Sequence, residues 1–252
     1  MSAQPTVEIA VSADEQHLSR DVAERLVRVL NRIQTEGRVP SVVLTGGSIA
    51  DQVHRAVLDV PEHAEVDWAQ VDVWFGDERY VRSDDSDRNA LQAREAFLSV
   101  LPVDPARVHE MPASDGRHGD DVDAAAEAYA AEIGRVLGDE SRFDVLMLGI
   151  GPDGHCASLF PGHEALQAQG TVVGVRRSPK PPPTRISLTM GMLRRADEVW
   201  FIASGEEKAQ AVHDAFNGRN IDTVPASGPK GRERTLWLLD AEAAGKLPPP
   251  AG

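Results

Sequence analysis

Short apolar runs alternate with helical patterns along the chain. The strongest run covers residues 143–150 and is apolar over most of its length, which is typical of a strand in a sheet that is covered on both faces. Further strands are predicted at residues 7–11, 42–44, 71–75, 171–175, 185–189, 199–203 and 235–239.

Helical patterns fill most of the gaps between these strands. Apolar residues from Leu18 to Ile33 recur on one helical face, and Ser12 followed by Glu15 forms a capping-box signature before them. Other helices are predicted after the Gly46-Gly47 pair, from near Ser86, from near Asp120 and after Ser204. Strands that alternate with helices predict an α/β fold: a three-layer α/β/α sandwich with a mostly parallel sheet.

No internal repeat or linker divides the 252 residues, so one domain over residues 1–252 is predicted. The proline-rich segment 178–183 is too short to separate two domains, and we interpret it as a stiff surface loop. Residues 1–5 and 247–252 are expected to be frayed.

Charge and composition narrow the function. The net charge of −14 argues against a nucleic-acid partner, and no apolar stretch is long enough for a membrane span. The chain shows no secretory signal, and its single cysteine, Cys156, cannot form an internal disulfide, so a cytoplasmic location is expected. An anionic substrate would need cations concentrated locally, and lysine occurs at only four positions (Lys180, Lys208, Lys230 and Lys246).

Candidate chemistry follows the strands, because ligands of parallel α/β sheets gather outside the carboxyl ends of the strands. The first such segment is Thr45-Gly46-Gly47-Ser48. Paired glycines before a helix allow an anion to approach the backbone amides, which predicts a phosphate site. The alternative is a tight strand-to-helix turn with Ser48 as the N-cap.

The second segment is Asp77-Glu78-Arg79. Taken alone, three adjacent charges after a buried strand indicate a solvated turn. In the functional interpretation Asp77 and Arg79 face a cleft, where Arg79 would stabilise an oxyanion or a phosphate.

The third segment, residues 149–161, is the most informative. It has three glycines, and Asp153 stands two residues before His155. A histidine transfers protons near neutral pH, and a neighbouring carboxylate can orient its ring. The alternatives are an N-capping Asp153 and a structural His155. No second histidine lies at helical spacing, so no metal site is predicted.

The fourth candidate is a pair of cations after later strands, Arg185 and Lys208. Each taken singly is an ordinary surface charge. Together they would supply the local positive charge that a phosphate needs in so acidic a protein.

In this order the segments resemble one known family, the 6-phosphogluconolactonases, over roughly residues 7–239. The segments that carry the resemblance are Thr45-Gly46-Gly47-Ser48, Gly76-Asp77-Glu78-Arg79, Gly151-Pro152-Asp153-Gly154-His155, Ser158-Leu159-Phe160-Pro161, Arg185-Ile186-Ser187 and Gly205-Glu206-Glu207-Lys208-Ala209. The resemblance implies an α/β sandwich related to glucosamine-6-phosphate isomerases, with no metal or organic cofactor. It implies hydrolysis of 6-phosphoglucono-1,5-lactone to 6-phosphogluconate in the oxidative pentose phosphate pathway.

The resemblance also implies roles for residues. His155 looks like the catalytic base. Arg185 and Lys208, with the Gly46-Gly47-Ser48 turn, look like the phosphate holders. Arg79 and Asp77 look like the residues that face the reacting end. Asp153 is expected to hold the tautomer of His155, with Asp77 as the alternative.

Two other functions remain open. A glucosamine-6-phosphate isomerase would share the Asp-Gly-His segment, but that family carries Ala-Phe-Asn-Glu-Pro where this chain has Ala157-Ser158-Leu159-Phe160-Pro161. A non-catalytic sugar-phosphate sensor would bind the same ligand without hydrolysing it. The expected partner in each case is a small phosphorylated sugar, and the expected assembly is a monomer or a small homo-oligomer.

Overall fold

The computed structural model describes residues 5–138 and 142–248. Its centre is a six-stranded sheet in the order β1-β9-β8-β5-β2-β3, in which every neighbouring pair is parallel. The strands of this sheet are β1 (Thr6–Ser12), β2 (Ser41–Leu44), β3 (Asp72–Phe75), β5 (Phe143–Gly149), β8 (Ala196–Ala203) and β9 (Arg234–Asp240).

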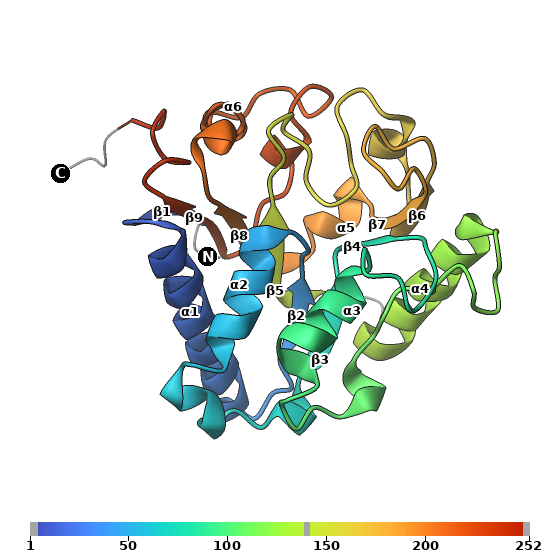
Figure 1. Ribbon diagram of the computed structural model, residues 1–252, viewed down its shortest axis with the longest axis horizontal. Helices are drawn as coiled ribbons and strands as arrows, with labels where there is room; N and C mark the ends of the chain where they lie inside the picture. Colours follow the sequence, from blue (N-terminus) through green and yellow to red (C-terminus); the bar gives the residue numbers. More distant parts are fainter. Residues whose placement is uncertain (1–4, 139–141, 249–252) are drawn as a thin grey trace.

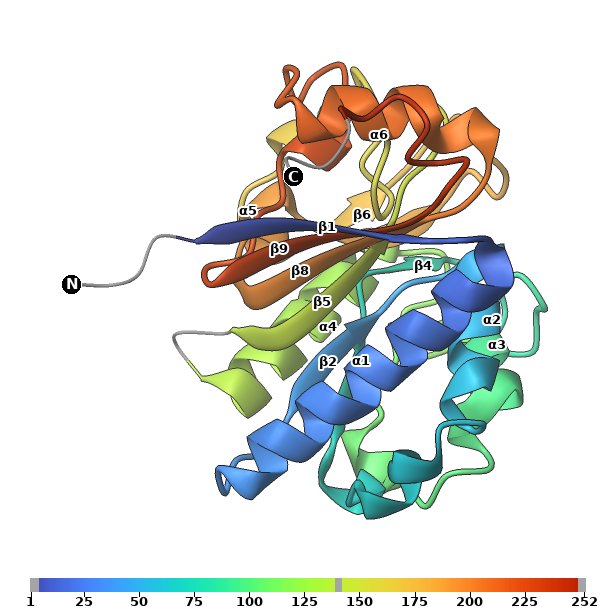
Figure 2. The same cartoon turned by 90° about the vertical axis from the view of Figure 1, so that its left-hand side faces the viewer.

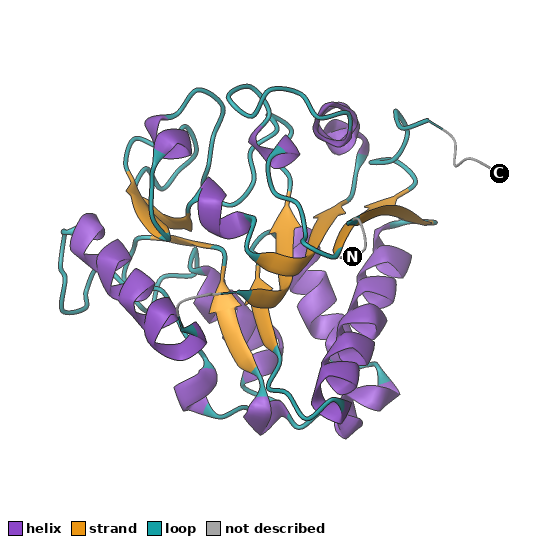
Figure 3. Ribbon diagram, turned by 180° about the vertical axis from the view of Figure 1, so that it is seen from behind, coloured by secondary structure: helices purple, strands orange, loops and turns teal. Residues whose placement is uncertain are grey.

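Helices cover both faces of this sheet (Figures 1 and 2). The α-helices are α1 (Glu15–Thr35), α2 (Ser48–Val57), α3 (Asn89–Ala93), α4 (Val122–Leu137), α5 (Met190–Leu193) and α6 (Ala209–Phe216). The single-turn elements are η1 (Pro61–Glu65), η2 (Trp68–Gln70), η3 (Arg94–Leu98), η4 (Pro105–Arg107), η5 (Glu164–Gln167), η6 (Glu206–Lys208) and η7 (Pro225–Ser227). Helices α1, α2 and α3 pack on one face, and α4, α5 and α6 pack on the other. The predicted three-layer α/β fold is confirmed, and Figure 3 shows the layers from behind.

The continuous apolar runs of the strands follow from the helical layers on the two faces of the sheet. Val42 and Leu44 of β2 pack against the cluster under α1 and α2, whereas Val43 between them packs against the cluster on the other face. The same division holds along β5 between Val145 and Leu146. Because successive side chains of a strand point to opposite faces, both faces of such a strand must be apolar.

Two of the predicted strands lie outside the parallel sheet. β7 (Arg185–Leu188) pairs antiparallel with β6 (Val172–Val175) and with β4 (Asp77–Arg79), which makes a separate three-stranded sheet. The interpretation of residues 77–79 as a solvated turn is wrong, since they form strand β4. An apolar pattern shows that a segment is extended but not which segment it pairs with.

The capping of the first helix also differs from the prediction. Asp14 is the N-cap of α1, and its side chain accepts a hydrogen bond from the His17 backbone N–H. Ser12 ends β1 instead, where its hydroxyl lies 2.5 Å from the Asp21 carboxylate. The capping box predicted at Ser12 and Glu15 is therefore wrong. An aspartate nearer to the helix accepts the first-turn amide, a role in which aspartate and serine are about equally good.

Two further predictions touch the limits of the described chain. Most of the segments 1–5 and 247–252, where fraying is predicted, lies outside the described residues. Within residues 5–138 and 142–248, no helix combines the length and the apolar character that a membrane crossing requires.

A buried histidine makes the stability of this fold depend on pH. His54 of α2 is 3% exposed, stacks on Phe97 at 4.8 Å, and burial lowers its pKa from 6.5 to about 4. The unfolded chain therefore takes up this proton first, so the stabilisation from neutral His54 is complete above pH 6.5 and is lost as the pH falls towards 4. At about pH 5 the loss amounts to about 2 kcal/mol.

We test this with His54→Leu and urea unfolding at about pH 7.5 and about pH 5. The wild type should lose about 2 kcal/mol more unfolding free energy than the variant between the two conditions. Equal losses in both proteins would show that His54 does not contribute to the pH dependence.

Candidate functional site

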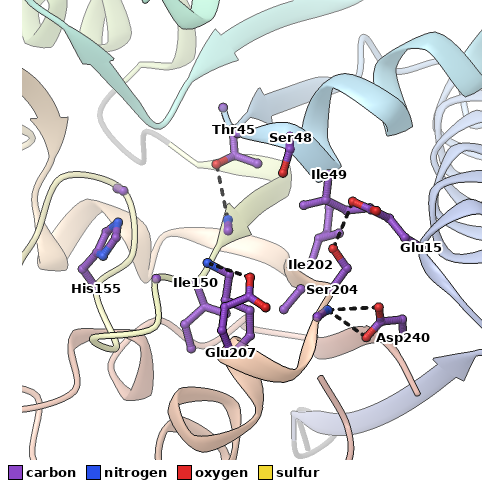
Figure 4. Close-up of a pocket in the computed structure, with 18 of the residues that line it drawn as sticks. Glu15, Thr45, Ser48, Ile49, Ile150, His155, Ile202, Ser204, Glu207 and Asp240 are labelled. Carbon is purple, nitrogen blue, oxygen red and sulfur yellow. Dashed lines mark hydrogen bonds and ion pairs between the residues drawn. The ribbon is translucent and has the colours of Figure 1, made fainter. Parts of the chain in front are cut away.

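A cleft of about 740 Å³ opens at the carboxyl ends of the parallel strands (Figure 4). It lies where the direction of chain winding reverses, since β2 leads to β3 on one side while β5 leads to β8 and β9 on the other. This reversal is the usual ligand position in open α/β sheets. The loop after β2 is joined there to the end of β5, because the Gly149 N–H donates to Thr45 Oγ1 at 3.3 Å.

The structure brings nearly all of the predicted site residues to this cleft. Its lining includes Thr45, Gly46, Gly47, Ser48, Asp77, Arg79, His155, Arg185 and Lys208. Asp153 does not line the cleft but contacts His155. These residues come from loops and strands that are far apart in the chain, and the fold gathers them around one space.

The ring of His155 is held on two sides. Its Nδ1 lies 2.5 Å from Asp153 Oδ1, and its face stacks on Phe160 with ring centroids 4.6 Å apart. Burial by itself would raise the pKa of Asp153, but the hydrogen bond and charge of His155 and the charge of Lys180 hold it well below its usual range.

This contact defines the tautomer. An ionised carboxylate only accepts hydrogen bonds, so the proton of the short contact belongs to His155 Nδ1. The lone pair of the neutral ring is then on Nε2, for which the described part of the chain offers no hydrogen-bond partner. Of the two carboxylates considered for this role, Asp153 contacts the ring, whereas Asp77 accepts from Ser158 Oγ at 2.6 Å.

The loop that carries this pair depends on a close backbone approach at Gly151. The Gly151 N–H donates to the His155 carbonyl at 2.9 Å, which closes the loop. A Cβ at residue 151 would lie well inside 3.0 Å of both the His155 ring and the Asp153 carboxylate. The glycine therefore leaves room for the two side chains beside it.

A buried polar group supports the other wall of the cleft. Glu78 is fully buried, and its carboxylate accepts the N–H groups of Asn89 at 2.7 Å and Ala90 at 2.9 Å, at the start of α3. Burial raises the pKa of Glu78, and the charge of Arg88 and these amides oppose the rise. The solvated-turn interpretation is wrong here, because Glu78 anchors a helix.

Asn89 links this group to the glycine turn. Its amide Nδ2 donates to the Asp77 carbonyl at 2.9 Å, and a Cβ at residue 46 would collide with its side chain. Gly46 is thus required by packing. The N-cap of α2 is Gly47, with a φ of 105° and no side-chain hydrogen bond, so the alternative in which Ser48 caps this helix is wrong.

Two cations of the cleft, Arg185 and Lys208, have no carboxylate closer than 3.9 Å among the described residues. Arg185 donates to the carbonyls of Pro181 at 2.8 Å and Pro182 at 3.2 Å, and its closest ring contact is Phe160. Lys208 has only Glu207, at 3.9 Å. Burial lowers the pKa of Arg185 and the pKa of Lys208. Because these two positive charges are not fully neutralised by carboxylates, binding of an anion beside them is favourable.

Arg79 also faces the cleft. Its Nη1 donates to the Asp87 carbonyl at 2.5 Å, while its Nε is buried and finds no acceptor within the described chain. Within residues 5–138 and 142–248, this guanidinium therefore makes one hydrogen bond, through Nη1.

The sequence did not reveal several residues of the site. Lys180 lines the cleft although segment 178–183 is interpreted above as a surface loop, and its only sequence signal is the rarity of lysine. Asn89 had no recognisable signal, and Phe160 was noted only as part of the segment Ser158-Leu159-Phe160-Pro161, without a role. Cys156 is fully buried, which raises the pKa of its thiol and favours a packing role over a nucleophilic one.

Metal binding has no candidate cluster among the residues that the structure describes, since nowhere do three or more His, Cys, Asp or Glu side chains gather in a suitable way. The expectation that the site works without a metal or organic cofactor stays a prediction.

Comparisons with known proteins agree with this site. The family model described as glucosamine-6-phosphate isomerases/6-phosphogluconolactonase matches residues 13–237. A 6-phosphogluconolactonase of Streptomyces coelicolor is 46% identical over 256 residues, covering 98% of each chain. One of Mycobacterium tuberculosis is 42% identical over 244 residues, covering 95% of this chain and 98% of its own.

The fold leads to the same group of proteins. The crystal structure of 6-phosphogluconolactonase from Thermotoga maritima matches with a TM-score of 0.80 and 26% identity, over 93% of this chain and 100% of that one. The match to the family model spans most of the chain and includes every segment on which the resemblance rests. The chain therefore belongs to the glucosamine-6-phosphate isomerase/6-phosphogluconolactonase family.

Proposed function

We propose that this protein hydrolyses 6-phosphoglucono-1,5-lactone to 6-phosphogluconate, the first step after glucose-6-phosphate oxidation in the oxidative pentose phosphate pathway. The single observation that carries the proposal is His155, whose Nε2 is available in a cleft that also holds poorly compensated cations. The names of the Streptomyces coelicolor and Thermotoga maritima relatives support the same activity. We place the reaction in the cytoplasm, in a single-domain protein that is a monomer or a small homo-oligomer.

The cations would hold the phosphate. Arg185 and Lys208 provide the charge, and the Gly46-Gly47-Ser48 turn provides backbone N–H groups at the start of α2. Anchoring the phosphate fixes the lactone carbonyl relative to His155, which lowers the entropic part of the barrier.

The chemistry then needs one base and one oxyanion partner. His155 Nε2 removes a proton from water as the water oxygen attacks the carbonyl carbon. The negative charge on the carbonyl oxygen is stabilised by Arg79, whose guanidinium lines the cleft and makes one side-chain hydrogen bond, to the Asp87 carbonyl, among the described residues. The protonated imidazole of His155 then gives its proton to the ring oxygen of the lactone as the bond between this oxygen and the carbonyl carbon breaks. Asp153 stabilises the imidazolium until the proton leaves.

The direct test generates the lactone in place from glucose 6-phosphate and follows its decay at early times, with and without the protein. Faster decay than the spontaneous reaction is expected. Decay at the spontaneous rate, together with binding of 6-phosphogluconate, would identify a sensor. Release of ammonia from glucosamine 6-phosphate instead would identify a deaminase.

Lys208 provides a test of the phosphate assignment. Lys208→Met is expected to raise KM by about 10- to 100-fold, because a hydrogen bond to a charged group contributes about 1.5–3 kcal/mol. The effect on kcat should be smaller, because the enzyme binds the phosphate group equally in the substrate and in the transition state. Lys246→Met is the matched control, because Lys246 is exposed and its ammonium donates to Gln210 Oε1 at 3.0 Å, away from the cleft. An unchanged KM in Lys208→Met would remove this residue from the phosphate site.

A further inference from the structure

The ammonium of Lys180 lies beside the proposed catalytic pair. Its Nζ is 3.4 Å from Asp153 Oδ1 and 3.3 Å from His155 Nδ1. Because Nδ1 carries the proton of the short contact to Asp153, it does not accept a hydrogen bond from lysine. The carboxylate oxygen therefore accepts from both donors, and the three groups form a compact triangle.

The backbone of Lys180 is held by hydrogen bonds, which places its side chain beside the Asp153 and His155 side chains. The hydroxyl of Ser178 donates to the Lys180 carbonyl at 2.9 Å, and the Ser178 N–H donates to the Pro183 carbonyl at 2.9 Å. Arg185 Nη2 reaches the Lys180 carbonyl at 3.2 Å and the Pro181 carbonyl at 2.8 Å. Segment 178–183 is thus closed by its own hydrogen bonds and is held by Arg185, which lines the cleft.

We propose that Lys180 is a positioning residue, whose ammonium holds the Asp153 carboxylate against Nδ1 of His155 and so keeps Nε2 directed at the substrate. This rests on the proposed lactone hydrolysis, in which Nε2 is the base. The side chain of Asp153 is 35% exposed, and among the described residues its only side-chain partners are His155 and Lys180. Without the second donor, the carboxylate is free to turn towards solvent and release the ring.

The surrounding charges are consistent with this role. His155 is faced by Asp153 of its own loop and by Lys180 of the following segment, and its stacking partner Phe160 also contacts Arg185. Lys208 approaches from η6, where the charge of Lys180 acts together with burial to lower its pKa. Of Lys180, Arg185 and Lys208, only Lys180 lies within 4.0 Å of the Asp153 carboxylate in the described chain.

A competing role is direct binding of the substrate phosphate, since Lys180 also lines the cleft. The two roles differ in what they change. A phosphate ligand affects binding of the product and KM, whereas a positioning residue affects the ring of His155 and kcat.

The experiment compares Lys180→Met, Lys180→Arg and the surface control Lys246→Met in the full-length protein. The first readout is the ¹⁵N spectrum of the His155 imidazole at mildly alkaline pH, identified by its loss in His155→Gln. It reports the tautomer and the Nδ1–H hydrogen bond without requiring any activity. The second readout is the affinity for 6-phosphogluconate, and the third is kcat and KM for the lactone.

We expect Lys180→Met to lose the single Nδ1–H tautomer and to lower kcat by about 10- to 100-fold, as a misplaced catalytic group does. Product affinity should stay close to that of the wild type, and Lys180→Arg should recover much of the tautomer signal. If Lys180→Met does not fold, Lys180→Gln replaces it with the same expectations.

A variant without the cation that keeps the wild-type tautomer overturns the proposal, whether or not its product affinity falls. Absence of lactonase activity in the wild type would reject the proposed function alone, because the tautomer readout still reports whether Lys180 positions the pair.

Discussion

Replacing His155 with alanine is expected to lower kcat by about 10²- to 10⁴-fold, the usual contribution of a general acid–base group. Among the described residues that line the cleft, only the His155 imidazole has both an available lone pair, on Nε2, and a carboxylate, Asp153, that fixes its tautomer. Its removal leaves the cations in place, so KM should change much less than kcat. The residual rate above the spontaneous one would come from binding and from the oxyanion partner.

The measurement is the initial rate of lactone decay over a range of substrate concentrations, after subtraction of the uncatalysed rate. His118→Ala serves as the control, because His118 contacts Arg117 on a loop outside the cleft. Unfolding curves establish that both variants are folded. A His155→Ala protein with wild-type turnover would end the assignment of this residue as the base.

Replacing Gly151 with alanine should reduce kcat by at least about 10²-fold, although no functional group is removed. The added methyl group would lie well inside 3.0 Å of the His155 ring and of the Asp153 carboxylate. Both neighbours are side chains, so they can move aside without unfolding the loop, but they then lose the contact that directs Nε2 into the cleft. We therefore expect a folded protein with a displaced catalytic pair.

Gly134→Ala is the matched control for this substitution. Gly134 lies on an exposed part of α4, and a Cβ there meets nothing within 4 Å. Alanine at this helical position should stabilise the protein by up to about 1 kcal/mol and leave turnover unchanged. Normal activity in Gly151→Ala, with the ring signal of His155 unmoved, would contradict the packing of this loop.

Much of the fold could be predicted from the chain alone. The apolar runs at β2, β5 and β8 are continuous because helices cover both faces of the parallel sheet. Each of these strands therefore needs apolar side chains on both faces, and this pattern can be recognised from neighbouring residues alone. Where the local pattern is ambiguous, prediction fails. Ser12 and Asp14 both suit the N-cap of a helix, and in the fold Asp14 takes this position while the Ser12 hydroxyl donates to Asp21.

The candidate site could be predicted where a residue type is rare in its position. Asp153 and His155 follow the strongest strand with glycines around them, and rarity of lysine draws attention to Lys208. Glu78 was misjudged, because three adjacent charges usually face solvent, whereas burial of this one is compensated by the amides at the start of α3.

Lys180 shows most clearly what local pattern cannot supply. The prolines that flank Lys180 predict a stiff loop, and the loop is constrained. The position of this loop beside the cleft, however, depends on Arg185, whose guanidinium donates hydrogen bonds to the carbonyls of Lys180 and Pro181.

By itself, then, the sequence determined the three-layer α/β architecture, the family and the residues from which the site is drawn, because periodicity and motif order are properties of neighbouring residues. Only the tertiary structure decided that β4, β6 and β7 form their own antiparallel sheet, that Asp153 rather than Asp77 contacts His155, and that the Lys180 ammonium lies 3.4 Å from the Asp153 carboxylate. Each of these depends on which distant segments come within hydrogen-bonding distance. That is a consequence of packing the whole chain around one sheet, and no local pattern encodes it.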